Sequence, residues 1–373
     1  MKRLAQFVLS LIFSGLVLYA LSWHFDLRQT MLSVRQAQPS LLIIGITLMV
    51  VAYLLRGARW RIWERSLSYW DSLRLILIGF MGNNLLPARL GEILRAHCTT
   101  VKTSDDRGRT TALASIAAER ILDGLVLAVF GLVGIALVPV DRRLQWALCL
   151  VSLVFAGLTL GLVLSIRLHE RLRSFIAAAN RRFPGHVTAF AREKAFHLLD
   201  GLLPLGSLPR MLGAITMTAI IWGIEIGFYY FVGLAVWERM SVPTALLSLV
   251  VGNFASLVPF ALGGIGAIEA VVPVFLISSG VSPYPALAMV LLQHAGQYFF
   301  TTITGAILYL AGGFSRIPLA DPKAAIPRRP AAAAPSSVID ETRSSLDKLS
   351  TSVELKPVPR RNHPLVDGHT SVK

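Results

Sequence analysis

The chain has 373 residues, of which 54% are hydrophobic and only 15% are charged. Soluble domains carry about 25% charged residues, so this composition, with a mean hydropathy of +0.62, excludes an ordinary soluble domain. The net charge is +15. Because the chain is so apolar and no basic-aromatic nucleic-acid module is present, we expect this charge in cytoplasmic loops and no nucleic-acid partner. Cys98 and Cys149 lie in different segments without metal-ligand spacing, so no metal site is predicted.

Six apolar stretches are predicted to span the membrane. In chain order they cover residues 4–21, 39–55, 111–138, 144–166, 211–236 and 286–311. A signal peptide is the alternative for the first, but the run is long and has no clear cleavage site, so we interpret it as a retained helix. The second ends in a cluster that contains Arg56, Arg59, Trp60 and Trp63. This mixture is typical of a helix end at the membrane–water interface.

Two further apolar segments are interrupted. One contains GNNLLPARLGEILR from Gly82 to Arg95, and the other contains GNFASLVPFALGGIGAIE from Gly252 to Glu269. Each has an early Asn, a central Pro, glycines and a late Glu. In hydrocarbon such a backbone is tolerated only where protein or a water-filled cavity takes its free N–H and C=O groups. We therefore predict two broken, re-entrant segments, a pattern that points to the binding site of a transporter.

The basic residues predict the orientation of these segments. By the positive-inside rule, both termini and the loops after Arg56, Lys102 and Arg167 lie in the cytoplasm. The first broken segment then enters from the cytoplasm and the second from outside, which is the arrangement of an inverted-topology repeat. The near-equal intervals from Arg56 to Asn83 and from Glu225 to Asn253 agree with such a repeat. The predicted fold is an all-α polytopic membrane protein of about six transmembrane helices plus two re-entrant broken segments in an inverted repeat.

The chain divides into two predicted regions. Residues 1–315 form the integral membrane domain, and residues 316–373, rich in Ala, Pro, Ser and charge, are expected to form a disordered cytoplasmic tail. Within the first region, residues 167–210 are basic with recurring Phe. Amphipathic helices on an anionic leaflet and a solvated loop are both open for this stretch.

Charged side chains within the apolar segments are candidates for function, because such charges are costly unless they are paired or face a cavity. Arg89, Glu92 and Arg95 are three residues apart, so on a helix they share a face where Glu92 can pair with both arginines. The alternative is an ion-pair ladder at a loop end outside the membrane.

The motif AAERILDGL brings a second group of charges. Glu119 and Asp123 share a helix face, and Arg120 can meet Asp123 one turn away. A structural pair at the mouth of the helix is the alternative. Glu225, inside its own span, has no basic residue in its helix and needs a partner such as Arg56 or Arg120, or a proton.

The last candidates follow the second interruption. Glu269 comes after GGIG and is either a cavity residue or a cap that neutralises the start of the next helix. Gln293 and Gln297 share a face of the last span, with His294 beside them. His294 is either a proton relay or a hydrogen-bonded packing residue.

Together these features predict a cavity suited to an anionic headgroup, since helix amino ends near both interruptions favour anions. We expect membrane lipids as partners, no cofactor and no catalytic residue, and a homo-oligomer stays open. The predicted cavity residues are Arg56, Asn83, Asn84, Arg89, Glu92, Arg95, Glu119, Arg120, Asp123, Glu225, Asn253, Glu269 and Gln293.

Four motifs in order, RGARWRIW, GNNLLPARLGEILR, AAERILDGL and VPFALGGIGAIE, resemble the transmembrane region of lysylphosphatidylglycerol synthases, the lipid-flippase half of the multiple peptide resistance factor. The resemblance covers residues 4–313. It implies a multi-pass protein of the bacterial inner membrane with a flippase-like fold, which moves phospholipids or related lipids between leaflets. The positions that match its motifs are Asn83, Arg89, Glu92, Arg95, Glu119, Arg120, Asp123 and Glu269.

One departure from the family changes the expectation. Bifunctional members continue into a soluble aminoacyltransferase domain, whereas a short low-complexity tail follows here, so a stand-alone transporter rather than an enzyme is expected. No ATP-binding loop motif is present, and Glu92, Glu225 and Glu269 are candidates for proton coupling if transport is not downhill. The alternatives are a lipid-modifying enzyme with Glu119 or Glu269 as general base, and a non-catalytic partner in an envelope lipid pathway.

Overall fold

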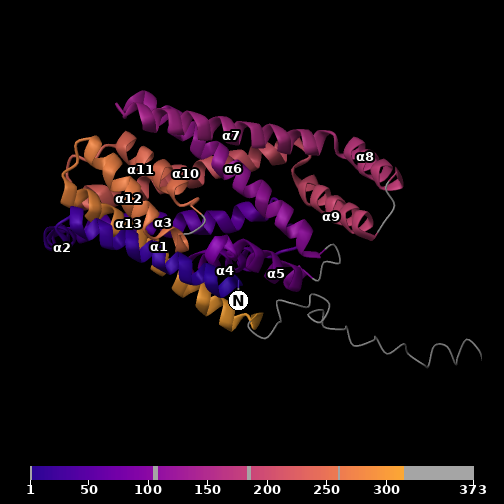
Figure 1. Ribbon diagram of the computed structural model, residues 1–373, viewed down its shortest axis with the longest axis horizontal. Coiled ribbons are helices and arrows are strands. Elements are labelled where there is room, and N and C mark those ends of the chain that lie inside the picture. Colours follow the sequence, from indigo (N-terminus) through magenta and orange to yellow (C-terminus); the bar gives the residue numbers. More distant parts are fainter. Residues whose placement is uncertain (1, 104–107, 183–185, 259–260, 315–373) are drawn as a thin grey trace, which may run out of the picture. The chain divides into compact units, whose positions relative to one another are not determined.

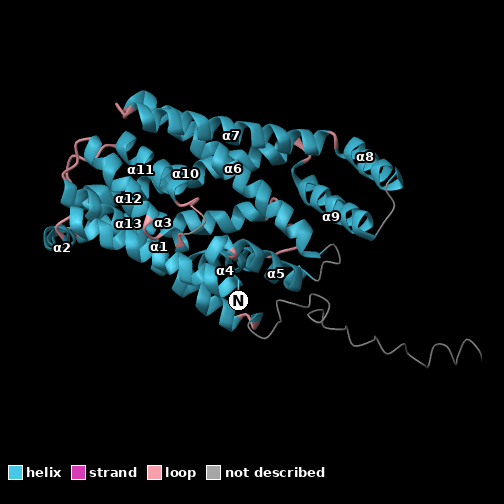
Figure 2. Cartoon of the chain, in the orientation of Figure 1, coloured by secondary structure: helices cyan, strands magenta, loops and turns pink. Residues whose placement is uncertain are grey.

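The computed structural model describes residues 2–103, 108–182, 186–258 and 261–314 (Figure 1). Within these ranges the regular structure is helical, and Figure 2 shows no strand. The segment from residue 316, for which we expect disorder, lies outside the described residues.

The described residues form thirteen α-helices and three short 3₁₀ turns. The helices are α1 (Lys2–His24), α2 (Leu27–Gln36), α3 (Pro39–Trp60), α4 (Tyr69–Leu85), α5 (Gly91–Thr103), α6 (Gly108–Leu137), α7 (Arg142–Arg167), α8 (His169–Arg182), α9 (His186–Leu202), α10 (Leu208–Val236), α11 (Val242–Ala255), α12 (Ala267–Ser278) and α13 (Pro283–Ala311). The turns are η1 (Pro87–Arg89), η2 (Leu203–Leu205) and η3 (Leu262–Gly264).

The long apolar helices agree with a membrane protein. Among the described residues, α3, α6, α7 and α10 are long and apolar enough to cross a bilayer. The other two predicted spans are also helices, α1 with 23 residues and α13 with 29. This is the all-α, multi-pass membrane fold that the sequence predicts.

The first interruption is a sharp turn between α4 and α5. Leu86 is extended after the end of α4 (φ −113°, ψ 140°), and Ala88 and Arg89 then both take the left-handed conformation with φ 54°. α5 begins at Gly91 and packs back against α4. A Cβ on Gly91 would lie 2.2 Å from the carbonyl oxygen of Gly79, so only glycine permits this approach.

The second interruption, between α11 and α12, has the same order of parts. An extended residue lies between α11 and η3, directly before η3. The turn η3 itself contains two left-handed glycines, Gly263 (φ 57°) and Gly264 (φ 89°). The caps also match, because Ser241 Oγ accepts from the backbone N–H of Thr244 at 3.2 Å, as Ser68 Oγ accepts from that of Asp71 at 3.1 Å. α4 and α11 therefore begin with the same serine cap.

The packing of the helices is reciprocal between two halves of the chain. α3 packs along α10, α4 against α13, and α11 against α6. Within the first half α3 contacts α4 and α5 contacts α6, and within the second half α10 contacts α11 and α12 contacts α13. The two turns η1 and η3 also touch. The interruptions therefore meet inside the helix bundle.

The basic segment at residues 167–210 is helical. α8 and α9 lie together beyond the end of α7 in Figure 1, and α9 packs against α6 and α7. A Cβ on Gly201 of α9 would lie 2.5 Å from the carbonyl oxygen of Thr111 in α6, so α9 and α6 approach each other closely. The segment therefore forms helices, while their amphipathic character and their contact with a lipid surface stay predictions.

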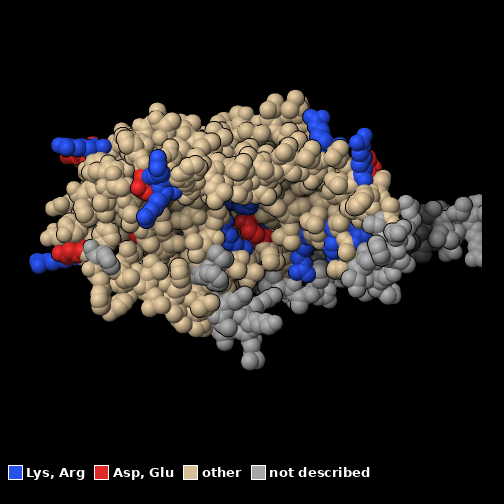
Figure 3. All heavy atoms as spheres, turned by 45° about the horizontal axis from the view of Figure 1, so that its top comes forward, with Lys and Arg blue, Asp and Glu red and all other residues tan. Residues whose placement is uncertain are grey.

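The outer surface is apolar over most of its area. Figure 3 shows a face on which uncharged residues cover most of the area, with a recess near the middle where acidic and basic side chains gather. Large apolar side chains such as Trp146, Leu153 and Leu160 of α7 are exposed on the outside. Such a surface suits the hydrocarbon of a bilayer.

Candidate functional site

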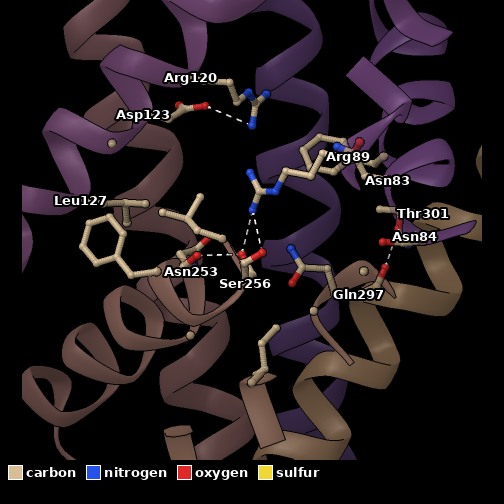
Figure 4. A pocket seen from close by; sticks show the side chains of 18 of the residues that line it. Asn83, Asn84, Arg89, Arg120, Asp123, Leu127, Asn253, Ser256, Gln297 and Thr301 are labelled. Atoms are coloured by element: carbon tan, nitrogen blue, oxygen red, sulfur yellow. Dashed lines mark hydrogen bonds and ion pairs between the residues drawn. The ribbon is translucent and has the colours of Figure 1, made fainter. Parts of the chain in front are cut away.

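A cavity of about 510 Å³ lies where the two interruptions meet (Figure 4). Both broken segments line it, and α3, α6, α7, α10 and α13 complete the wall. In Figure 4, Arg89 and Arg120 reach into this space from opposite elements, with Asn253 and Ser256 facing them. The irregular backbone thus lies beside a cavity within the protein, where its free N–H and C=O groups are kept away from hydrocarbon.

The thirteen predicted cavity residues fall into two groups. Those that line the cavity are Arg56, Asn83, Asn84, Arg89, Glu92, Arg120, Asp123 and Asn253. The other five lie behind the cavity wall, and each contacts either a lining residue or a residue that is itself paired with a lining residue. They are Arg95, Glu119, Glu225, Glu269 and Gln293. The sequence motifs therefore come together around this cavity, although only some of their residues line it.

Arg89 stands out among the lining cations. Its Nη2 donates to the backbone carbonyl of Ser256 at 3.0 Å and to Ser256 Oγ at 3.1 Å. It forms no ion pair with any described residue, whereas Arg56, Arg120 and Asp123 are all paired. Among the described residues, the Arg89 guanidinium therefore hydrogen-bonds only to Ser256, which is uncharged.

The predicted pairing of Glu92 with Arg89 and Arg95 is wrong. Arg89 precedes the start of α5 and has a left-handed backbone, so it does not share a helix face with Glu92. Glu92 instead accepts from Asn83 Nδ2 at 3.3 Å and lies 3.7 Å from Arg120 Nε. The turn at the proline removes Arg89 from this face, and Arg95, on the same helix as Glu92, pairs with Glu119 instead.

A buried ion-pair network stands behind the cavity around Arg59. Arg59 Nη2 lies 2.5 Å from Glu119 Oε1, and Nη1 lies 2.5 Å from Asp123 Oδ1 and donates to Thr218 Oγ1 at 2.8 Å. Arg95 Nη2 lies 2.8 Å from the other oxygen of Glu119. Charges in a low-dielectric interior persist only when they are paired in this way.

Arg59 is a site residue that sequence reasoning missed. We predict Arg59, Trp60 and Trp63 at the membrane–water interface, but Arg59 and Trp60 are completely buried and Trp63 is 3% exposed. The guanidinium of Arg95 lies 3.8 Å from the centre of the Trp60 ring. These side chains are thus packed within the protein, while the position of this helix end at the membrane–water interface stays a prediction. The three-residue spacing from Arg56, which places Arg59 on the same face of α3, was the available signal.

Two of the predicted ion pairs are confirmed. Glu225 pairs with Arg56 across α10 and α3, and both are buried. The Arg56 guanidinium also lies 4.9 Å from the centre of the Trp222 ring. Arg120 Nη1 lies 3.5 Å from Asp123 Oδ2, one turn along α6. The first pair joins α3 to α10, and the second lies within α6.

Glu269 and His294 form a separate buried pair at the second interruption. Glu269 Oε2 accepts from the backbone N–H of Gly266 at 2.8 Å, which confirms that this side chain caps α12. Its other oxygen, Oε1, lies 2.6 Å from His294 Nδ1. His294 Nε2 lies 3.1 Å from the carbonyl oxygen of Gly263 in η3. Nearby, Gln293 Nε2 donates to Gln297 Oε1 at 3.2 Å.

One wall of the cavity is apolar. Phe155 of α7 stacks on Phe254 near the end of α11, with ring centres 5.8 Å apart. Gly124 makes room for it, since a Cβ there would lie 1.9 Å from Phe155 Cε1. Leu158 and Leu257 of the same wall are each 45% exposed. The cavity thus combines a charged side with an apolar side that continues to the outer surface.

An all-helical membrane protein with a charge-lined cavity between two broken helices is the class that this fold and site define. Residues 7–305 match the family model described as "Lysylphosphatidylglycerol synthase TM region". The match covers most of the chain, which belongs to this family.

Three archaeal proteins are similar to the chain. "Glycosyltransferase AglD" of Haloferax volcanii is 26% identical over 342 residues, which cover 81% of this chain and 54% of that protein. A "UPF0104 membrane protein" of Methanothermobacter thermautotrophicus is 24% identical over 303 residues, covering 76% of this chain and 89% of its own length. "UPF0104 membrane protein PH1989" of Pyrococcus horikoshii is 23% identical over 325 residues, covering 82% and 96%. The chain thus spans about half of the first relative and most of the other two. No solved structure matches the chain.

Proposed function

We propose that this protein is a lipid translocase that moves a phospholipid or a related lipid between the leaflets of the bacterial inner membrane. The family and the multi-pass helical fold support a membrane protein in lipid or glycan translocation. The cavity between two interrupted helices supports the translocase in particular, because transporters build substrate sites from such helices.

The observation that carries the proposal is the cation left without an ion pair in the cavity. Arg56, Arg120 and the deeper arginines all meet carboxylates, whereas Arg89 hydrogen-bonds to Ser256 and forms no ion pair with a described residue. A phosphate oxygen on an entering headgroup offers Arg89 a charge-assisted hydrogen bond that Ser256 cannot match. We therefore assign an anionic headgroup to this site.

The apolar wall supports a lipid rather than a soluble anion. With the headgroup at Arg89, acyl chains would pass between Phe155, Leu158 and Leu257 toward the bilayer. The recess in the middle of the mostly uncharged face in Figure 3 agrees with such a sideways route. A soluble ion would gain nothing from this apolar surface.

We further propose that the two interruptions are re-entrant segments of an inverted repeat, with both termini in the cytoplasm. The reciprocal packing of α4 with α13 and of α11 with α6 supports the repeat, since a twofold axis generates such pairs. The matching serine caps of α4 and α11, and Asn83 and Asn253 each two residues before the helix end, support it as well. Rocking of one half against the other would expose Arg89 to each leaflet in turn.

The enzyme alternative fits the site less well. The candidate general base Glu119 is surrounded by Arg59, Arg95 and Arg120 and does not line the cavity. Glu269 caps α12 and is likewise absent from the lining. A general base must come within hydrogen-bonding distance of its substrate. The glycosyltransferase name belongs to a relative of which this chain covers 54%.

Lipid movement in proteoliposomes tests the proposal. Fluorescent phosphatidylglycerol and phosphatidylcholine are placed in one leaflet, and their transfer is followed for the wild type, Arg89→Ala and Arg143→Ala, whose side chain is exposed on α7. A lost hydrogen bond to a charged group costs roughly 1.5–3 kcal/mol, so Arg89→Ala should slow phosphatidylglycerol transfer about tenfold or more.

The outcomes separate the alternatives. Arg143→Ala should behave as the wild type. If wild-type protein leaves both lipids in place, the translocase proposal is wrong, and lipid extracts of cells with and without the protein would then be compared for a modified species. Both lipids carry a phosphate group, so slowing of both by Arg89→Ala would still place Arg89 at the phosphate, whereas unchanged transfer of phosphatidylglycerol in Arg89→Ala would contradict the assignment of an anionic group to Arg89.

A further inference from the structure

The side chain of His294 is held between two oxygen atoms. Its Nδ1 lies 2.6 Å from Glu269 Oε1, and its Nε2 lies 3.1 Å from the carbonyl oxygen of Gly263. Glu269 is 4% exposed and His294 5% exposed. The second carboxylate oxygen of Glu269 accepts from Gly266 N–H. Both ring nitrogens and both carboxylate oxygens are therefore engaged within the protein.

These contacts determine how many protons the pair carries. A carbonyl oxygen only accepts hydrogen bonds, so His294 Nε2 must carry a hydrogen to bond Gly263. An ionised carboxylate also only accepts, and a neutral imidazole has one N–H. The contact between Nδ1 and Glu269 Oε1 therefore needs a second proton, on the ring or on the carboxyl. At 2.6 Å the two atoms are within hydrogen-bonding distance of each other.

Removal of that proton breaks one of the two contacts. If the remaining hydrogen stays on Nε2, a ring lone pair faces the Glu269 carboxylate, and if it moves to Nδ1, a lone pair faces the Gly263 carbonyl. Gly263 packs closely on the first broken segment, since a Cβ on it would lie 3.0 Å from Asn84 Oδ1 and 2.8 Å from Tyr298 Cε2. Proton loss therefore acts where the two interruptions touch.

We propose that Glu269 and His294 form a proton-binding pair that couples lipid movement to a proton gradient, an inference that rests on the proposed translocase function. The protonated pair fastens η3 to α12 and α13, and the deprotonated pair releases it. His294 lines the cavity, so the proton exchanges with solvent there. One proton is taken up with the lipid on one side and released on the other, and the lipid itself is not chemically altered.

The surroundings of the pair bring few other ionisable groups. Tyr298 packs edge-on against His294, with ring centres 6.2 Å apart. α11 and residues 8–23 of α1 contain no Asp, Glu, Lys, Arg or His. The charged groups of the other packed elements are Glu225 of α10, paired with Arg56, and the exposed Arg210 of the same helix; Asp71 and Arg74 of α4, paired with each other; the exposed Arg28 and Arg35 of α2; and Arg89 of η1, which lines the same cavity. A change in charge at this site thus reports chiefly on Glu269 and His294.

The proton count is measured first, independently of transport. Protein with ¹⁵N-labelled histidine is placed in lipid nanodiscs at pH 6, and the His294 signals are assigned by their loss in His294→Gln. The infrared carboxyl band of Glu269 is assigned in the same way with Glu269→Gln. A doubly protonated His294 ring or a protonated Glu269 is expected. A neutral imidazole beside an ionised carboxylate at pH 6 and at every lower pH at which the protein stays folded would overturn the proposal.

Transport under an imposed gradient is measured second, with fluorescent phosphatidylglycerol in proteoliposomes. With one proton per lipid, a difference of one pH unit across the membrane should produce roughly tenfold leaflet asymmetry of the lipid at steady state. His294→Gln and Glu269→Gln should each abolish the asymmetry that the pH difference produces in the wild type. His197→Gln, a half-buried histidine of α9, is the matched control and should keep it.

The two proposals fail in different ways in this experiment. Wild-type lipid that crosses to an even distribution under the gradient overturns the coupling and leaves the translocase intact. Lipid that does not move with or without a gradient overturns the translocase itself. Asymmetry that persists in both His294→Gln and Glu269→Gln shows that the coupling proton lies elsewhere, which also contradicts the proposal.

Discussion

Arg89 Nη2 donates to the backbone carbonyl of Ser256 at 3.0 Å, so the turn of the first broken segment is fastened to the end of α11 in the second. The bond is made to the carbonyl of the C-cap residue of α11. An entering phosphate that takes Arg89 away would therefore release the contact between the two broken segments. Binding and movement are linked through one side chain.

Substitution of Arg89 by Lys tests whether the shape of the guanidinium matters. Lysine retains the charge but not the planar fork that binds two oxygen atoms at once. Arg89→Lys should therefore move phosphatidylglycerol at a rate between those of the wild type and Arg89→Ala, in the same proteoliposome assay. Ser256→Ala keeps the carbonyl partner and should stay close to wild type. A larger loss in Ser256→Ala than in Arg89→Lys would show that the serine hydroxyl, not Arg89, binds the headgroup.

The buried pair of Arg56 and Glu225 should be strongly coupled. Removal of one partner leaves a buried charge alone, so Arg56→Leu or Glu225→Leu should each lower stability by about 3–5 kcal/mol. The double variant should lose much less than the sum, because no charge is left unpaired. Thermal unfolding in detergent measures all four proteins, and additive losses would argue that the two side chains act independently.

Gly91 is expected to be irreplaceable at the start of α5. A Cβ there would lie 2.2 Å from the carbonyl oxygen of Gly79 and 2.3 Å from the backbone nitrogen of Asn83, neither of which can rotate away. Gly91→Ala should cost roughly 1–3 kcal/mol or more in unfolding free energy. Gly157→Ala on α7 has open space around it and should instead stabilise the helix by roughly 0.4–1 kcal/mol. Equal stability of the two variants would contradict the close approach of α4 and α5.

Gly124 controls the position of the Phe155 ring in the apolar wall. Gly124→Ala would push this ring off its place over α6 and away from Phe254, and lipid transfer should fall. A second substitution, Phe155→Ala, removes the ring and should restore transfer in the double variant. Gly131→Ala, on the same helix and 3.2 Å from Val250 Cγ1, is the control. Failure of the double variant to recover would locate the effect outside the wall.

The sequence predicted the parts of this fold that depend on composition and on breaks in periodicity. The long helices, the turn at Pro87 and the glycine turn near Gly263 follow from apolar length and from residues that a continuous helix does not tolerate. α2 was not predicted, because its ten residues are too polar to read as a span and too short to show a clear period.

The site was predicted by residue type better than by partner. The pairing of Glu225 with Arg56 and of Arg120 with Asp123 follows from the high cost of an unpaired charge in an apolar helix. The partners of Arg59 and of Arg89 could not be derived, because both depend on where helices from distant parts of the chain cross.

The balance of charge around the cavity has an electrical consequence. Among the described residues of the site, every arginine except Arg89 is matched by a carboxylate, and the protonated pair of Glu269 and His294 is neutral as a whole. A bound anionic headgroup neutralises Arg89. After the lipid and the proton leave, the positive Arg89 is offset by the negative pair.

Neither the loaded nor the empty protein then moves net charge across the membrane. A charge that crosses a potential of 100 mV would change the energy by about 2.3 kcal/mol, but here no such term arises. A potassium diffusion potential imposed on the proteoliposomes should therefore leave the distribution of phosphatidylglycerol unchanged, while a pH difference of the same energy shifts it. Such a carrier would work as well in a depolarised cell as in an energised one, provided that its two sides differ in acidity.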